Sequence, residues 1–180
     1  MAEPEYPSLA TLESLPYIDV DGQLPHRFEG CIGVYAIYSA PQELAYIGYS
    51  RDVSLSLKQH MVRQPQHCFW VKVTTVDKPN RTLLEGIKAA WIAENGQVPP
   101  GNGKAATLWE QPIDVKAQML PVESAQYIDP QLDDQQHLKV LKQAARRIEA
   151  DILKILTERG VQETLRFNPK LKENGLLDLK

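Results

Sequence analysis

"YIGYSRDVSLSLKQH" (Tyr46–His60) joins a short run of alternating side chains to a stretch with helical spacing. Alternation up to Ser50 is the pattern of a half-buried strand. From Val53 the apolar residues recur every four positions, and Ser50 or Asp52 can cap the helix that they predict. The segment therefore predicts a strand that passes directly into an amphipathic helix.

Further strands and a second helix surround this segment. Strands are predicted at 31–38, 44–50 and 68–76, where β-branched and aromatic residues dominate, and a turn at 39–43 makes the first two strands a hairpin. A helix is predicted at 80–96, between an Asn cap and a Gly stop. The predicted fold class is α+β, with a small antiparallel three-stranded sheet flanked by helices in the order β-β-α-β-α.

Beyond this core the organisation is simpler. Residues 1–30 predict an acidic, Pro-rich arm, 104–132 an irregular connector and 161–180 a loose polar tail. Residues 133–160 predict a long amphipathic helix, whose apolar stripe runs from Leu138 to Ile155. We expect the stripe to pack on the protein's own core; a homodimer through this helix is the alternative.

Composition limits the classes of protein. At 180 residues, with 43% hydrophobic and 24% charged residues, the chain fits one globular domain with extensions. No apolar run reaches the roughly 20 residues that span a membrane, and the N-terminus lacks a signal-peptide pattern. Cys31 and Cys68 predict buried free thiols and hence a cytoplasmic or organelle-stromal location, although a disulfide or metal pair is the alternative. The excess of basic residues over residues 31–104 is mild, so nucleic acid is permitted rather than required.

Several short motifs occur in a fixed order within residues 31–103. They are "GVY" (Gly33–Tyr35) and "YIG" (Tyr46–Gly48) on adjacent strands, a helix ending in His60, "LLEGIKAAWI" and "PPGN". Together these motifs and the β-β-α-β-α order resemble the GIY-YIG nuclease superfamily. The chain is most similar to a divergent branch related to the nuclease-like domain joined to chloroplast monothiol glutaredoxin. A Cys-Gly-Phe-Ser motif of glutaredoxins does not occur in this sequence.

This resemblance implies metal-dependent hydrolysis of DNA phosphodiester bonds. Tyr35 and Tyr46 match the motif tyrosines, one of which takes the proton from the attacking water. His60 matches the histidine that binds the scissile phosphate or a tyrosine. Glu85 matches the acid that holds Mg²⁺ or Mn²⁺. Asn102 matches the asparagine that ties down the loop.

One position departs from the family pattern. Ser56 lies one helical turn before the histidine, where the family has an arginine that faces the phosphate. Loss of such a donor typically costs about 10²- to 10³-fold in rate. Arg51 is the nearest substitute. The sequence therefore predicts a weak or altered endonuclease, and the alternative is a degenerate module that acts as a DNA- or protein-binding scaffold.

Overall fold

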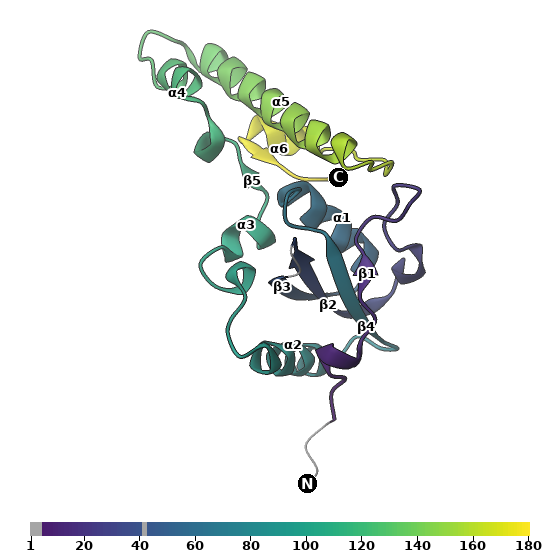
Figure 1. Ribbon diagram of the computed structural model, residues 1–180. Coiled ribbons are helices and arrows are strands. Elements are labelled where there is room, and N and C mark those ends of the chain that lie inside the picture. The colour runs from purple at the N-terminus through teal and green to yellow at the C-terminus, as the bar shows by residue number, and fades with distance from the viewer. Residues whose placement is uncertain (1–4, 41–42) are drawn as a thin grey trace. The chain divides into compact units, whose positions relative to one another are not determined.

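The computed structural model describes residues 5–40 and 43–180. The chain divides into two compact units, Met1–Glu110 (unit 1) and Gln111–Lys180 (unit 2). Figure 1 shows that unit 1 combines a small sheet with helices, whereas unit 2 is mainly helical. The predicted α+β class is confirmed at this level.

An antiparallel sheet of four strands, in the order β1-β4-β2-β3, forms the centre of unit 1. The strands are β1 (Leu15–Pro16), β2 (Ile32–Ser39), β3 (Glu43–Ser50) and β4 (Trp70–Val76). β2 and β3 pair as the predicted hairpin, with Tyr35 opposite Gly48. Residues 41 and 42 of the predicted turn lie outside the described residues.

The two main helices of unit 1 begin at the predicted caps. Helix α1 (Val53–Arg63) starts at Asp52, whose carboxylate accepts a hydrogen bond from a first-turn backbone N–H. Helix α2 (Arg81–Asn95) starts in the same way at Asn80. It ends at Gly96, whose φ of 80° suits glycine best. These caps fix where each helix starts beside the sheet.

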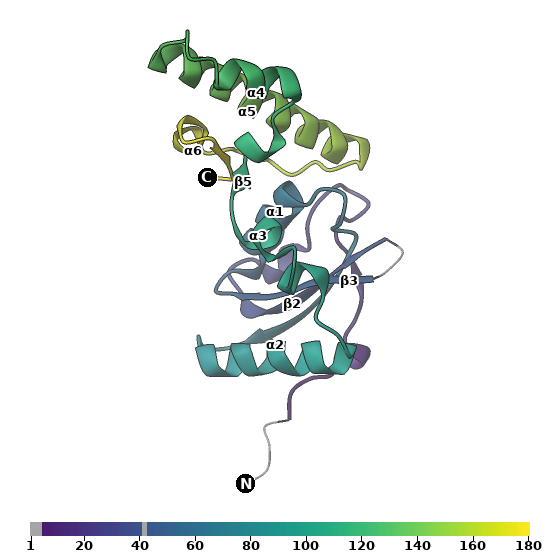
Figure 2. The same ribbon diagram turned by 90° about the vertical axis from the view of Figure 1, so that its left-hand side faces the viewer.

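The two helices cover opposite faces of the sheet. In Figures 1 and 2, α2 lies along one face and α1 lies on the other. The α2 face holds a hydrophobic cluster of Leu9, Val34, Ala36, Ile47, Leu84, Ile87 and Trp91. Neighbouring residues of a strand point to opposite faces, so Tyr35 and Tyr46 belong to the α1 face.

The N-terminal segment packs on unit 1 and is more than an extended arm. It contains two 3₁₀ turns, η1 (Leu9–Thr11) and η2 (His26–Phe28), besides β1. The fully buried Tyr17 donates a hydrogen bond from its hydroxyl to the carbonyl of Leu57, 2.6 Å away. The frequent prolines left no strand or helix pattern to recognise in this segment. Its fixed position instead depends on contacts with residues far away in the sequence, such as that of Tyr17 with Leu57.

The region predicted as an irregular connector contains short ordered elements. After η3 (Pro100–Asn102), these are α3 (Ala106–Glu110), β5 (Ile113–Asp114), η4 (Lys116–Gln118) and α4 (Pro121–Tyr127). Each is seven residues long or less, too short for an apolar period to identify. α3 belongs to unit 1, and the elements after it belong to unit 2.

Unit 2 is built around α5 (Asp134–Glu158), which is within two residues of its predicted bounds. Its buried residues face α4, α6 (Pro169–Glu173) and β6 (Leu176–Leu177). The stripe thus packs on its own unit, as expected. The tail is not loose, because β6 pairs with β5 and Leu177 is fully buried.

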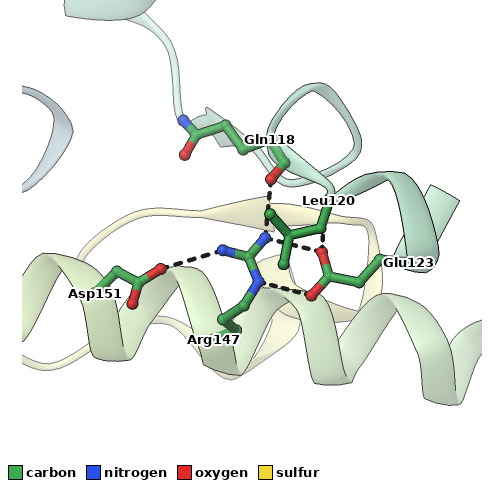
Figure 3. A network of polar contacts seen from close by, with 5 residues as sticks. All are labelled: Gln118, Leu120, Glu123, Arg147 and Asp151. Atoms are coloured by element: carbon green, nitrogen blue, oxygen red, sulfur yellow. Dashed lines mark hydrogen bonds and ion pairs between the residues drawn. The ribbon is translucent and has the colours of Figure 1, made fainter.

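A network around Arg147 ties α4 to α5 (Figure 3). The guanidinium donates to both carboxylate oxygens of Glu123, over 2.6 and 2.8 Å, and to the Gln118 carbonyl over 2.9 Å. Its third nitrogen reaches Asp151 at 3.1 Å. Arg147 also holds the pKa of the Glu123 carboxyl below its ordinary value. This fork-to-fork pair fixes the short helix α4 on α5.

Among the described residues, none of the helices combines the length and the apolar character that crossing a membrane would need.

Candidate functional site

Tyr35, Tyr46 and His60 come together on the α1 face of the sheet. The tyrosine rings, from adjacent strands, lie 6.3 Å apart between centroids. The Tyr35 hydroxyl and Nε2 of His60 are 2.9 Å apart, in hydrogen-bonding contact, and the Tyr46 ring lies 4.7 Å from the imidazole. All three residues are buried, with 3%, 6% and 4% of their surface exposed. The sequence thus predicted a real cluster, but a buried one.

Both motif glycines lie where other groups approach the backbone closely, and Gly48 does so at the cluster itself. A Cβ on Gly48 would lie 2.7 Å from the Tyr35 hydroxyl oxygen and 2.7 Å from the Tyr46 ring. A Cβ on Gly33 would lie 2.3 Å from the carbonyl oxygen of Thr74 on β4. Both positions need glycine because neighbouring groups approach the backbone closely.

Helix α3 covers the cluster. Trp109 stacks on Tyr46 with centroids 5.2 Å apart and planes 5° from parallel, and only 3% of its surface is exposed. The Tyr46 hydroxyl donates to the Glu110 carboxylate over 3.3 Å. Arg63 donates to the Trp109 carbonyl over 2.9 Å. The short helix is therefore held over the tyrosines at three points.

Burial keeps the cluster uncharged near neutral pH. It raises the pKa of Tyr35 and of Tyr46 well above the ordinary value of 10, so neither phenol ionises. It also lowers the pKa of His60 to about 3, and the nearby charge of Arg63 adds to this effect. A phenolate base, which the predicted hydrolysis needs, is thus disfavoured by the surroundings of both tyrosines.

Arg51, the predicted substitute for the arginine of the family pattern, does not contact the tyrosine cluster. Ser56, half-buried one turn before His60, donates to the Ser50 hydroxyl over 2.7 Å. Arg51 is exposed and makes no hydrogen bond or ion pair with the rest of the described chain. The cation whose charge acts on both tyrosines and the histidine is Arg63, near the end of α1. Arg51 is not among the charges that act on these three side chains, and its role as the substitute cation stays a prediction.

Glu85 is separate from the tyrosine cluster. It lies on α2, and its Oε1 accepts from Arg81 Nε at 2.7 Å and from the hydroxyl of Tyr49 at 3.1 Å. The bond from Arg81 lowers the pKa of Glu85. No group of three or more His, Cys, Asp or Glu side chains within the described ranges is placed to hold a metal ion. A lone carboxylate that already pairs with arginine does not fit the predicted Mg²⁺ or Mn²⁺ site.

Asn102 fixes the loop before α3 to the sheet. Its side-chain amide donates to the carbonyl of Ile47 over 2.7 Å and accepts from the Ile47 N–H over 2.8 Å. Both backbone groups of one β3 residue are thereby satisfied. This arrangement ties to β3 the segment that leads into α3, whose last two residues, Trp109 and Glu110, contact Tyr46.

The two cysteines differ in accessibility, although both were predicted to be buried. Cys68 is fully buried, and Cys31 is partly exposed immediately before β2. The Cys31 thiol donates to the Arg27 carbonyl at 3.5 Å, and its own carbonyl accepts from the Val53 N–H at the start of α1. Cys31 is thus a partly exposed residue on a backbone that is hydrogen-bonded to the start of α1.

The sequence pattern did not single out Trp109, Glu110 and Arg63. Arg63 stands three residues after His60, at the end of the observed helix α1, and that spacing was an available signal. Trp109 and Glu110 stand in a segment without recognisable periodicity. Their contacts with Tyr46 are long-range, so no local signal indicated them.

No family model matches the chain. A search of curated proteins found a similarity to a bifunctional monothiol glutaredoxin of Arabidopsis thaliana, a chloroplastic protein. The two are 35% identical over 99 residues, which is 53% of this chain. The chain spans about a third, 32%, of that relative's length.

This similarity confirms the predicted relationship to a chloroplast monothiol glutaredoxin, but it gives no evidence for the GIY-YIG superfamily. It overturns the predicted function, because the relative is named for thiol–disulfide redox chemistry and not for hydrolysis of DNA. The prediction of a metal-dependent endonuclease and hydrolase is therefore wrong, and the scaffold alternative gains no specific support. The covered, uncharged tyrosine cluster gives the physical reason why a motif match alone misled.

Proposed function

We propose that this protein takes part in thiol–disulfide redox chemistry through Cys31, which forms a mixed disulfide with glutathione and is released by a glutaredoxin-type partner. The observation that carries the proposal is the contrast between the two cysteines: Cys31 is a partly exposed residue, whereas Cys68 is fully buried. The similarity to a protein named as a monothiol glutaredoxin supports this class of chemistry.

The exchange needs one reachable sulfur and an external disulfide. The Cys31 thiolate attacks one sulfur of glutathione disulfide, so that a new S–S bond forms and the old one breaks. The second glutathione leaves as a thiolate and takes up a proton. Cys68 cannot resolve the mixed disulfide while it stays inside the fold. The resolving thiol therefore comes from another molecule.

One feature favours a redox partner over a catalyst. Cys31 is followed by Ile-Gly-Val and is not part of a Cys-Gly-Phe-Ser motif. We therefore assign to this chain the role of the protein that is modified and released, and not that of the glutaredoxin itself.

The test is incubation of the reduced full-length protein with glutathione disulfide, followed by intact mass spectrometry. We expect one glutathione adduct on the wild type and on Cys68→Ser, and none on Cys31→Ser. A glutaredoxin with glutathione should then remove the adduct faster than glutathione alone. An adduct that persists in Cys31→Ser, or a wild type that stays unmodified, would contradict the proposal.

For the fold alone, we keep the resemblance of residues 31–103 to the GIY-YIG arrangement as a proposal. The element order β2-β3-α1-β4-α2 supports it. A DNA partner, a homodimer through α5 and a cytoplasmic location stay predictions. Analytical ultracentrifugation of the full chain tests the homodimer, and the burial of the apolar stripe of α5 within unit 2 favours a monomer.

A further inference from the structure

A pocket of about 410 Å³ opens in unit 1, away from the tyrosine cluster. Its lining comes from the end of β3 and the start of α2, and consists of Tyr49, Ser50, Arg51, Pro79, Asn80, Arg81 and Leu84. Pockets of this size hold small molecules rather than single ions. Among the described residues, the lining includes two guanidinium groups and no carboxylate.

The two arginines differ in how they are held. Arg81 donates its Nε–H to Glu85, and the Glu85 carboxylate that orients this guanidinium is itself held by the Tyr49 hydroxyl. A guanidinium carries five N–H donors, and the bond to Glu85 uses one of them. Arg51 makes no hydrogen bond or ion pair with the part of the chain that the structure describes. The pocket thus offers one oriented and one unpaired guanidinium.

The rest of the lining has a different character. Pro79 and Leu84 supply an apolar wall, and Leu84 belongs to the buried core. Tyr49 adds an aromatic ring, with the Lys88 ammonium 5.9 Å from its centroid. An anionic group can meet the guanidiniums while an apolar body lies on this wall.

Unit 2 contains a second pocket, of about 500 Å³, whose lining does not select a class of ligand. Its lining includes Lys116 as well as Asp134 and Glu173, so both signs of charge are present. The pocket in unit 1 selects for an anionic ligand, because the charged side chains of its described lining, Arg51 and Arg81, are both positive.

We propose that the pocket between β3 and α2 binds a small organic phosphate, with the phosphoryl group on Arg51 and Arg81 and the organic body on Pro79 and Leu84. Planar, bidentate recognition of phosphate oxygens is the task for which arginine is suited. The excess of basic residues over 31–104 is mild, which favours a small anion over a nucleic-acid duplex. This inference is independent of the redox role of Cys31.

The test uses phenyl phosphate as the probe, titrated into the ¹⁵N-labelled full-length protein. We expect amide shifts concentrated at residues 49–51 and 80–84, and binding about tenfold tighter than that of inorganic phosphate, which has no apolar body. Phenol, which lacks the charge, should bind far more weakly. Equal binding of phenol and phenyl phosphate, or shifts confined to other residues, would overturn the proposal.

Variants identify the contribution of the guanidiniums. The double variant Arg51→Gln, Arg81→Gln should weaken phenyl phosphate binding at least tenfold. Arg146→Gln, which removes an exposed arginine of α5, should leave it unchanged. The amide spectrum of each variant shows whether the fold is intact. Equal weakening by both changes would mean non-specific attraction and would refute the site. If a DNA duplex binds at residues 49–51 and displaces phenyl phosphate, the ligand of this pocket is nucleic acid and the proposal of a small organic phosphate is overturned.

Discussion

Acid should destabilise unit 1 through His60 in a pH range where carboxyl groups contribute little. Burial lowers the pKa of His60 to about 3 in the folded protein. An unfolded histidine has a pKa near 6.5. As the pH falls below about 6.5, the His60 imidazole binds a proton in the unfolded chain but stays neutral in the folded chain. The stability is therefore complete above this pH and is lost progressively as the pH falls toward 3.

The size of the effect follows from these two pKa values. Integrating the difference in bound protons from pH 7 to pH 5 gives a loss of about 2 kcal/mol in the free energy of unfolding. Carboxyl groups ordinarily titrate near pH 4 and add little within this range. A loss of this size is a large part of the roughly 5–15 kcal/mol that stabilises a typical domain.

Tryptophan fluorescence during urea unfolding at pH 7 and pH 5 measures this loss for unit 1. All three tryptophans, Trp70, Trp91 and Trp109, belong to that unit. We expect His60→Gln to be less stable at pH 7 but to lose less than about 0.5 kcal/mol between the two pH values. His137→Gln, a change in unit 2, should keep the wild-type loss.

Equal losses in wild type and His60→Gln would refute the reasoning. A spectroscopic measurement guards against a variant that does not fold. The imidazole carbon signals of His60 in the wild-type protein should stay in the neutral position at pH 5. A midpoint near pH 6.5 would show that the ring is solvated and that the calculated loss does not arise there.

Three further changes test contacts of the fold. Gly48→Ala should cost unit 1 about 2–3 kcal/mol, because the added Cβ would overlap two tyrosine rings. Gly96→Ala has open space around the added Cβ but keeps a φ of 80°, and it should cost about 1 kcal/mol. The midpoints of urea unfolding measure the difference in stability between the two variants. Asn102→Ala should cost about 1–3 kcal/mol, because it leaves the N–H and the carbonyl of Ile47 without their side-chain partner. Aspartate cannot donate to the Ile47 carbonyl, so full stability in Asn102→Asp would contradict this reasoning. Arg147→Met should destabilise unit 2 by about 1 kcal/mol, measured by circular dichroism, while Arg146→Met has little effect; equal effects would show that the ion-pair network is not stabilising.

The elements of unit 1 could be predicted because their signals are local. Alternation defined the three main strands, and polar caps at Asp52 and Asn80 defined the helix starts. The long helix α5 was equally clear from its periodicity. The two-residue strand β1 and the short helices have no such signal, because contacts from distant parts of the chain determine them.

The site could be predicted only in part, because the sequence does not show on which face of the sheet each predicted site residue lies. Tyr35, Tyr46 and His60 were brought together as the sequence suggested. Glu85 was expected beside them, but no pattern in a single sequence states which face of a sheet a helix covers. Since α2 packs on the face of Ile47, Glu85 meets Arg81 and Tyr49 instead.

The accessible chemistry of unit 1 lies at one end of its sheet. Cys31 immediately precedes β2, whose first residues pair with the ends of β3 and β4, at Gly33–Ser50 and Ile32–Val76. The pocket with the two arginines lies where β3 ends and α2 begins, and therefore at that same end. The tyrosines are buried, and their ionisation would require α3 to move away at the cost of the Trp109 stacking and its hydrogen bonds. The partly exposed Cys31 and the arginine pocket need no such opening, so a reagent in solution should reach both in the folded protein before it reaches the buried tyrosines.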